Sequence, residues 1–111
     1  MYLKFDKVGD TVIAYMMGEL DHHSAEEVRN KVDNRIDVEK ANNLIMDFSG
    51  VTFMDSSGIG VVIGRYKKLN RNGGKVFVAN VTGAVERVFE LSGMFKIINL
   101  YNSIEEAINN I

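Results

Sequence analysis

The sequence predicts an α/β fold: a mixed, mostly parallel sheet of about five strands, with an opening β-hairpin and four helices. Three observations lead to this prediction. The length of 111 residues is that of one compact domain. Hydrophobic residues make up 46% of the chain, enough to form a core. Strand-like and helix-like segments then alternate without a linker, which favours parallel strands and right-handed crossovers in a single domain, residues 1–111.

The first two predicted strands form the hairpin. Leu3 and Phe5 alternate with polar neighbours, and residues 11–17 form a second strand-like run. Between them, residues 8–11 have Gly9 at the first central position of a tight turn. The hairpin therefore opens the fold.

A helix and a buried strand come next. Four apolar residues recur at helical spacing and predict a face on the core: Ala25, Val28, Val32 and Ile36. Two N-caps compete at the start of this helix, namely Asp21 and a capping box made by Ser24 and Glu27. Residues 44–48 form a nearly continuous apolar run, which is typical of a strand covered on both faces.

The second predicted helix begins near Ser57. Its apolar residues keep helical spacing: Ile59, Val62, Ile63, Tyr66 and Leu69. Lys67, Lys68 and Arg71 oppose the negative end of the helix dipole, and Gly73 with Gly74 ends the helix.

The remaining elements follow the same alternation. Residues 75–79 predict a strand, and Thr82 is placed to cap a third helix. Residues 97–101 predict the last strand. A capping box formed by Ser103 and Glu106 then begins a terminal helix.

Composition excludes several classes of function. Without cysteine the chain has no disulfide framework, thiolate metal site or cysteine nucleophile. No apolar run approaches the roughly 20 residues of a membrane span, and no secretory signal opens the chain, so we expect a cytoplasmic protein. The net charge is −2 and the basic residues are scattered. We therefore expect neither a nucleic-acid nor a membrane partner, and no cofactor.

Residues 49–60 contain more capping residues and glycines than one helix start needs. Asp55, Ser56 and Ser57 are all good N-caps, although a helix uses only one. Three glycines follow, each costing about 1 kcal/mol of helix stability relative to alanine: Gly58, Gly60 and Gly64. Either these residues merely cap and pack the helix, or they let another protein approach a serine that accepts a phosphate.

A phosphate at this helix start has a definite physical effect. It adds about 1.5 to 2 negative charges and three acceptor oxygens. The free N–H groups and positive dipole end of a helix tolerate such a group. Within a partner's contact surface and beside Asp55, the same group brings desolvation and charge repulsion. Binding would then fail while the fold survived.

Catalytic and metal-binding interpretations are weaker. Residues 58–64 approximate the glycine fingerprint of dinucleotide sites, but the spacing is one residue too long and the glycines do not follow a strand directly. A serine hydrolase needs a G-x-S-x-G elbow and a placed histidine, which Ser57 lacks. His22 and His23 are sequence neighbours that point apart on a helix, without a carboxylate cluster to complete a metal site. We expect no enzyme.

Three stretches, residues 18–26, 53–67 and 91–97, resemble the anti-sigma factor antagonist family, whose fold is called the STAS domain. The match covers nearly the whole chain, and the three stretches occur in the right order. The Asp-His-His sequence at 21–23 and the Phe-Met-Asp-Ser-Ser-Gly sequence at 53–58 are most similar to the sporulation branch, which counteracts the anti-sigma-F factor.

This resemblance implies a partner-switching cycle. The unphosphorylated antagonist binds an anti-sigma factor that is also a serine kinase, which releases the sporulation sigma factor. The kinase then phosphorylates the antagonist on the second serine of Asp-Ser-Ser-Gly, here Ser57, and a serine phosphatase resets it. By the same resemblance, five residues would form the partner-binding surface: Asp21, Asp55, Ser56, Gly58 and Ile59. We expect a monomer when the protein is free.

Two other hypotheses remain open. The helix start at residues 56–60 is also a possible anion site of a small-ligand or nucleotide-binding module. Alternatively, the same fold serves as an adaptor in a larger stress-signalling assembly, as relatives of this domain do. The choice of Ser57 over Ser56 rests on the resemblance alone.

Overall fold

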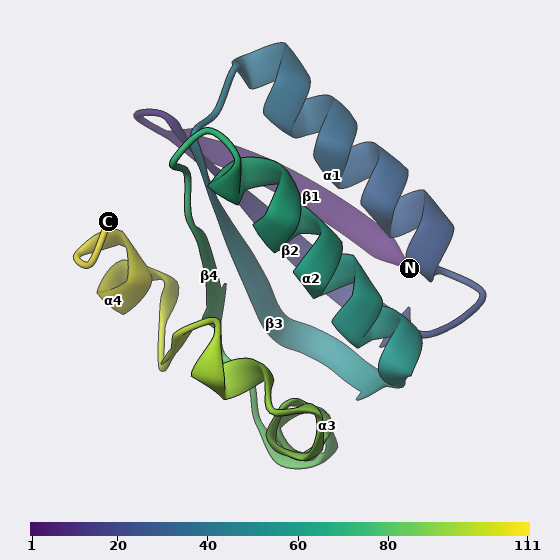
Figure 1. Cartoon of the computed structure of the whole chain (residues 1–111). Helices are drawn as coiled ribbons and strands as arrows, with labels where there is room; N and C mark the ends of the chain where they lie inside the picture. Colours follow the sequence, from purple (N-terminus) through teal and green to yellow (C-terminus); the bar gives the residue numbers. More distant parts are fainter.

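The computed structural model describes residues 1–111 as a five-stranded sheet with four α-helices (Figure 1). The strands are β1 (Tyr2–Val8), β2 (Thr11–Leu20), β3 (Asn43–Met54), β4 (Val76–Ala79) and β5 (Leu100–Tyr101). The helices are α1 (Ala25–Glu39), α2 (Ser56–Asn70), α3 (Gly83–Ser92) and α4 (Ile104–Ile108), with a 3₁₀ helix at Met94–Lys96. The predicted fold class is confirmed.

The sheet has the order β1-β2-β3-β4-β5. β1 and β2 are antiparallel, and every other neighbouring pair is parallel. Gly9 has a φ of 60°, the left-handed conformation that the turn of the opening hairpin requires. The carboxyl ends of β2 and β3 therefore lie together at one edge of the sheet, next to the starts of α1 and α2.

The two faces of the sheet are covered differently. Successive side chains along a strand point to opposite faces. Leu44 and Met46 face the main core, to which α1, α2 and α3 contribute, whereas Ile45 faces a smaller cluster that includes Ala107 of α4. Figure 1 shows α1 and α2 side by side on one face of the sheet. α4 packs on the other face, against β3, β4 and β5.

Three strand boundaries differ from the sequence prediction. β2 extends beyond residue 17 to Leu20, where it still pairs with β3. β3 continues beyond residue 48 to Met54, because it pairs with β2 as far as Leu20 and buries Val51 and Met54. The last strand is shorter than the predicted 97–101, since the chain first forms the 3₁₀ helix and only Leu100 and Tyr101 reach β4.

The predicted basic end of α2 is used for packing as well as for the dipole. Arg65 is only 5% exposed, and its Nε lies 2.8 Å from Asp33 Oδ1 on α1. One turn further, Lys68 Nζ lies 3.1 Å from Asp37 Oδ1. Burial lowers the pKa of Arg65, an effect that Asp33 opposes. The carboxyl half of α2 is thus held against α1 by charge as well as by apolar contact.

Candidate functional site

The start of α2 is organised by one carboxylate. Asp55 is the N-cap, and its Oδ1 accepts a hydrogen bond of 2.8 Å from the backbone N–H of Ser57. Its other oxygen, Oδ2, accepts one of 3.3 Å from the backbone N–H of His22. Asp55 therefore joins the helix start to the turn that precedes α1.

That turn, residues 21–24, is built around Asp21. The Asp21 carboxylate accepts hydrogen bonds from the backbone N–H groups of His23, at 2.9 Å, and Ser24, at 3.1 Å. Partial desolvation acts to raise the pKa of Asp21, but these hydrogen bonds outweigh it and lower the pKa below its ordinary value. Asp21 is therefore held as an anion at the edge of the sheet.

The predicted capping box at the start of α1 is wrong. Ser24 is the N-cap by position, but its hydroxyl donates to the carbonyl oxygen of Glu19 at 2.7 Å and caps no N–H group of the helix. The same hydroxyl accepts from the backbone N–H of Asp21 at 3.1 Å. Ser24 closes the turn and so fixes the position of Asp21. Thr82 of α3, too, caps by position without a side-chain hydrogen bond.

The two serines at the start of α2 differ in exposure. Ser56 is exposed, and Ser57 is half-buried. They are the first two residues of the helix, where backbone N–H groups lack carbonyl partners within the helix. The Ser57 N–H is already used by Asp55. An added anion at this position meets the positive end of the helix dipole.

The next two residues that the resemblance implicated face inward. Ile59 is 7% exposed, and Gly58 is buried. A Cβ atom on Gly58 would overlap the side chain of Met54 and come within 3.1 Å of Leu20 Cγ. Gly58 thus allows α2 to begin tightly against the ends of β2 and β3. Gly60 has open space instead, so the glycines do not share one role.

Two features that sequence reasoning missed lie at this edge. A hollow of about 310 Å³ beside the turn is lined by Met1, Glu19, Asp21, His23, Ser24 and Glu27. Three of these residues are acidic, so the hollow suits a basic side chain better than a phosphate. Phe53, which pairs in register with Glu19, is 47% exposed. The sequence showed these residues but not that the fold brings them together.

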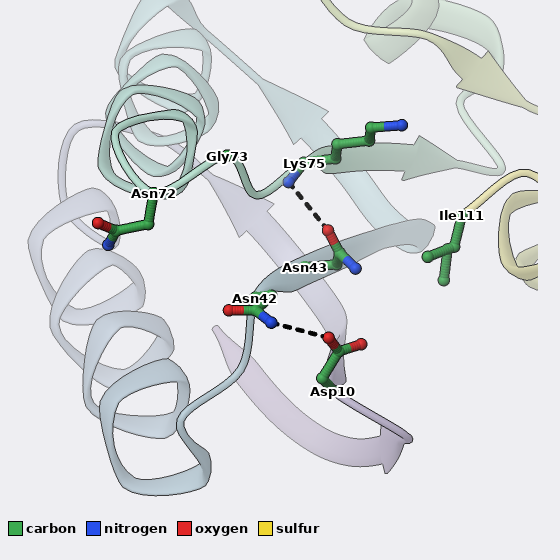
Figure 2. A pocket seen from close by; sticks show the side chains of 7 residues that line it. All are labelled: Asp10, Asn42, Asn43, Asn72, Gly73, Lys75 and Ile111. Atoms are coloured by element: carbon green, nitrogen blue, oxygen red, sulfur yellow. Dashed lines mark hydrogen bonds between the residues drawn. The ribbon is translucent and has the colours of Figure 1, made fainter.

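A second polar hollow, of about 320 Å³, lies at the opposite edge of the sheet (Figure 2). Asn42 donates to Asp10 Oδ2 at 2.8 Å, and Asn43 Oδ1 accepts from the Lys75 N–H at 3.0 Å. These hydrogen bonds tie together the beginnings of β2, β3 and β4. Stabilising the sheet therefore accounts for this polar group of residues.

Two further predictions concern metals and membranes. The rings of His22 and His23 lie edge to face with centroids 5.8 Å apart, and no group of three or more potential metal ligands forms in the chain. None of the helices combines the length and the apolarity that crossing a membrane requires.

Comparison with known proteins identifies the fold. The family model of the STAS domain matches residues 2–107. The chain belongs to the STAS domain family. The resemblance seen in the three sequence stretches is thereby confirmed, and so is the mixed five-stranded architecture that it implied.

Among STAS proteins, this chain is similar to antagonists of anti-sigma factors. It is 37% identical over 100 residues to the anti-sigma F factor antagonist of Paenibacillus polymyxa, covering 90% of this chain and 86% of that protein. A structure of the anti-sigma factor antagonist SpoIIAA in its unphosphorylated form matches with a TM-score of 0.85 and 34% identity, covering 98% of this chain and 95% of that one. A structure of the Bacillus cell fate determinant SpoIIAA in the phosphorylated form matches with a TM-score of 0.76 and 33% identity, covering 98% of each chain.

Proposed function

We propose that this chain is a cytoplasmic anti-sigma factor antagonist. Its unphosphorylated form binds an anti-sigma factor with serine kinase activity and so releases a sporulation sigma factor. Phosphorylation by that kinase at the start of α2 ends binding, and a serine phosphatase restores it. The observation that carries the proposal is the joining of the α2 serines to the Asp21 turn, through Asp55, at one edge of the sheet. The names and the two SpoIIAA forms of its relatives support it.

The chemistry of this edge suits a protein partner. Asp21 and the neighbouring acidic hollow offer a place for a basic side chain, and the exposed ring of Phe53 offers an apolar contact. Ser56 and Asp55 lie at the surface between these features and α2. Gly58 and Ile59, being buried, contribute by setting the position of the helix start.

A phosphate here would change the surface more than the fold. The helix N-terminus stabilises the added charge, because free N–H groups and the dipole face it. The same charge adds to those of Asp55 and Asp21 and fills space that a partner must occupy. A docking protein that tolerates a neutral hydroxyl therefore loses affinity for the dianion.

The two serines compete for the role of acceptor. The family resemblance implies Ser57, whereas exposure favours Ser56, because a hydroxyl must enter the kinase active site and Ser57 is half-buried. The backbone N–H of Ser57 is bonded to Asp55, which leaves its hydroxyl free of that interaction. Labelling of single variants decides between them.

The test uses Ser56→Ala, Ser57→Ala and the corresponding Asp variants with the cognate kinase. The Ala variant at the acceptor should abolish phosphorylation by ATP, as measured by mass spectrometry, and the other Ala variant should retain it. The Asp variant at the acceptor should weaken binding to the anti-sigma factor at least tenfold, about 1.4 kcal/mol, with an unchanged circular-dichroism spectrum. Phosphate on neither serine, or unaltered affinity of both Asp variants, would contradict the proposal.

A further inference from the structure

On the face of the sheet opposite α1 and α2, α4 contacts β3, β4 and β5, and the small cluster beneath it extends to Ile13 of β2. A pocket of about 350 Å³ lies there, lined by Lys4, Tyr15, Met16, Met17, Asp47, Ser49 and Gly50. It is on the face of the sheet opposite α1 and α2, so it is separate from the proposed phosphorylation site.

The pocket contains a buried carboxylate. Asp47 lies in the middle of β3 and is only 4% exposed. Its Oδ2 accepts from the Ser49 hydroxyl at 2.7 Å, and its Oδ1 accepts from Asn80 Nδ2 at 2.7 Å. None of the four ion pairs of the chain includes Asp47. A buried carboxylate is normally paired with a cation, so this one is held in place but not neutralised.

The backbone around Asp47 is shaped to hold it. Tyr15 pairs with Asp47, but the next pair joins Met17 to Gly50, so β3 contains one extra residue at a bulge. A Cβ on Gly50 would lie 2.8 Å from the backbone oxygen of Met16 as well as 2.5 Å from Met17 Cγ, so glycine is required where the strands approach. Asn80 has a φ of 62°, a conformation that asparagine tolerates better than most residues.

Carboxylate charges act on the Tyr15 phenol in this pocket. Burial raises the pKa of the Tyr15 phenol, and the charges of Asp6 and Asp47 raise it further. Lys4, which pairs in register with Tyr15, is the one cationic residue of the lining, and it is exposed. Two carboxylates therefore act on the phenol from the sheet, and the more deeply buried of them lies in the pocket wall.

We propose that this pocket binds a small organic cation, an alkylammonium or alkylguanidinium compound. Its charged group would pair with Asp47, and its aliphatic part would lie against Tyr15 and Met17, which give the pocket an aromatic and an apolar wall. Ser49 and Asn80 are positioning residues that fix the carboxylate. This is a ligand-binding role in addition to partner switching, and it does not depend on it.

The test is a titration of the full chain with butylamine, with butanol and butyrate as neutral and anionic controls of similar size. Chemical shifts of backbone amides should change around Ser49 and Gly50, with a dissociation constant on the order of 1 mM for butylamine. Neither control should reach comparable saturation. Butylamine should also lower the pKa of Tyr15, measured by ultraviolet absorbance against a Tyr15→Phe reference, because a bound cation stabilises the phenolate.

Two variants of the pocket and one matched control sharpen the test. Asp47→Asn keeps the shape of the side chain and should weaken butylamine binding at least tenfold. Lys4→Glu, at an exposed position where folding is not at risk, should tighten it at least threefold. Asp10→Asn, which removes a hydrogen-bonded carboxylate at the opposite edge, should leave it unchanged. The proposal would be overturned if butylamine and butanol bound equally well, if butylamine did not saturate, or if Lys4→Glu left the affinity for butylamine unchanged.

Discussion

The two ends of α2 are built for different purposes. At its carboxyl end, Arg65 is buried against Asp33, and Leu69 is buried in the core. At its amino end, Ser56 is exposed, and Asp55 accepts backbone hydrogen bonds and forms no ion pair. The ion pairs that anchor the helix to α1 thus lie at the end opposite the modifiable hydroxyls. A charge added at the start of α2 therefore leaves the attachment of the helix to α1 intact.

The largest loss of stability is expected from a substitution at the carboxyl end of α2. Arg65→Ala removes a buried side chain from between α1 and α2, so the free energy of unfolding should fall by about 3 kcal/mol, mostly through lost packing. Denaturant unfolding measures this. Ser56→Ala, at the other end, should change the same free energy by less than about 0.5 kcal/mol.

Arg65→Met separates charge from packing at the anchored end. Methionine keeps an apolar stem between the helices, and Asp33, whose side chain is 28% exposed, stays hydrated. The loss should then be below about 1 kcal/mol. A loss as large as that of Arg65→Ala would show that the ion pair, rather than packing, attaches α2 to α1.

Substitutions of two glycines in the first turns of α2 should change stability by an intermediate amount and in opposite directions. Gly58→Ala forces Met54 and Leu20 to move and should cost about 2 kcal/mol, as overpacking does. Gly60→Ala meets no neighbouring atom and should stabilise the helix by about 0.5 to 1 kcal/mol. Thermal or denaturant unfolding of the two variants tests this pair. Equal effects would mean that the close packing of the helix start is relaxed in solution.

The smallest expected effect is the contribution of Asp21 to the pH dependence of stability. Because the pKa of Asp21 is lowered in the folded protein, its contribution to stability is present above its ordinary pKa of 3.8 and is lost as pH falls through the folded value. The free energy of unfolding, measured between about pH 5 and pH 2, should therefore fall more steeply with decreasing pH in the wild type than in Asp21→Asn. Parallel curves would mean that the hydrogen bonds from His23 and Ser24 do not favour the carboxylate.

The sequence predicted the order and type of the elements because each has a distinct hydrophobic spacing. It placed the end of β3 too early, since Ser49 and Gly50 look like a turn, whereas the structure uses them in a bulge. It placed the start of the last strand too early, because Ile97 has a strand-like side chain but follows a 3₁₀ helix and is 55% exposed. Local patterns do not reveal pairing partners.

The candidate site was predicted only in part, because local patterns do not show which distant residues come together. The surplus caps at Asp55 and Ser56 marked the helix start, and the structure brings them next to the Asp21 turn. The inward packing of Gly58 and the role of Asp47 were not visible, because both depend on contacts between residues distant in sequence. A glycine or an aspartate alone does not indicate which neighbour it will meet.

The order of the sheet also bears on synthesis at the ribosome. Each strand lies beside the one made immediately before it, so translation adds strands at a single growing edge. The β1–β2 hairpin is complete once Leu20 has been added, and no later strand has to insert between earlier ones. The order of translation is therefore the spatial order of assembly, and a nascent chain never has to reopen paired strands to continue folding.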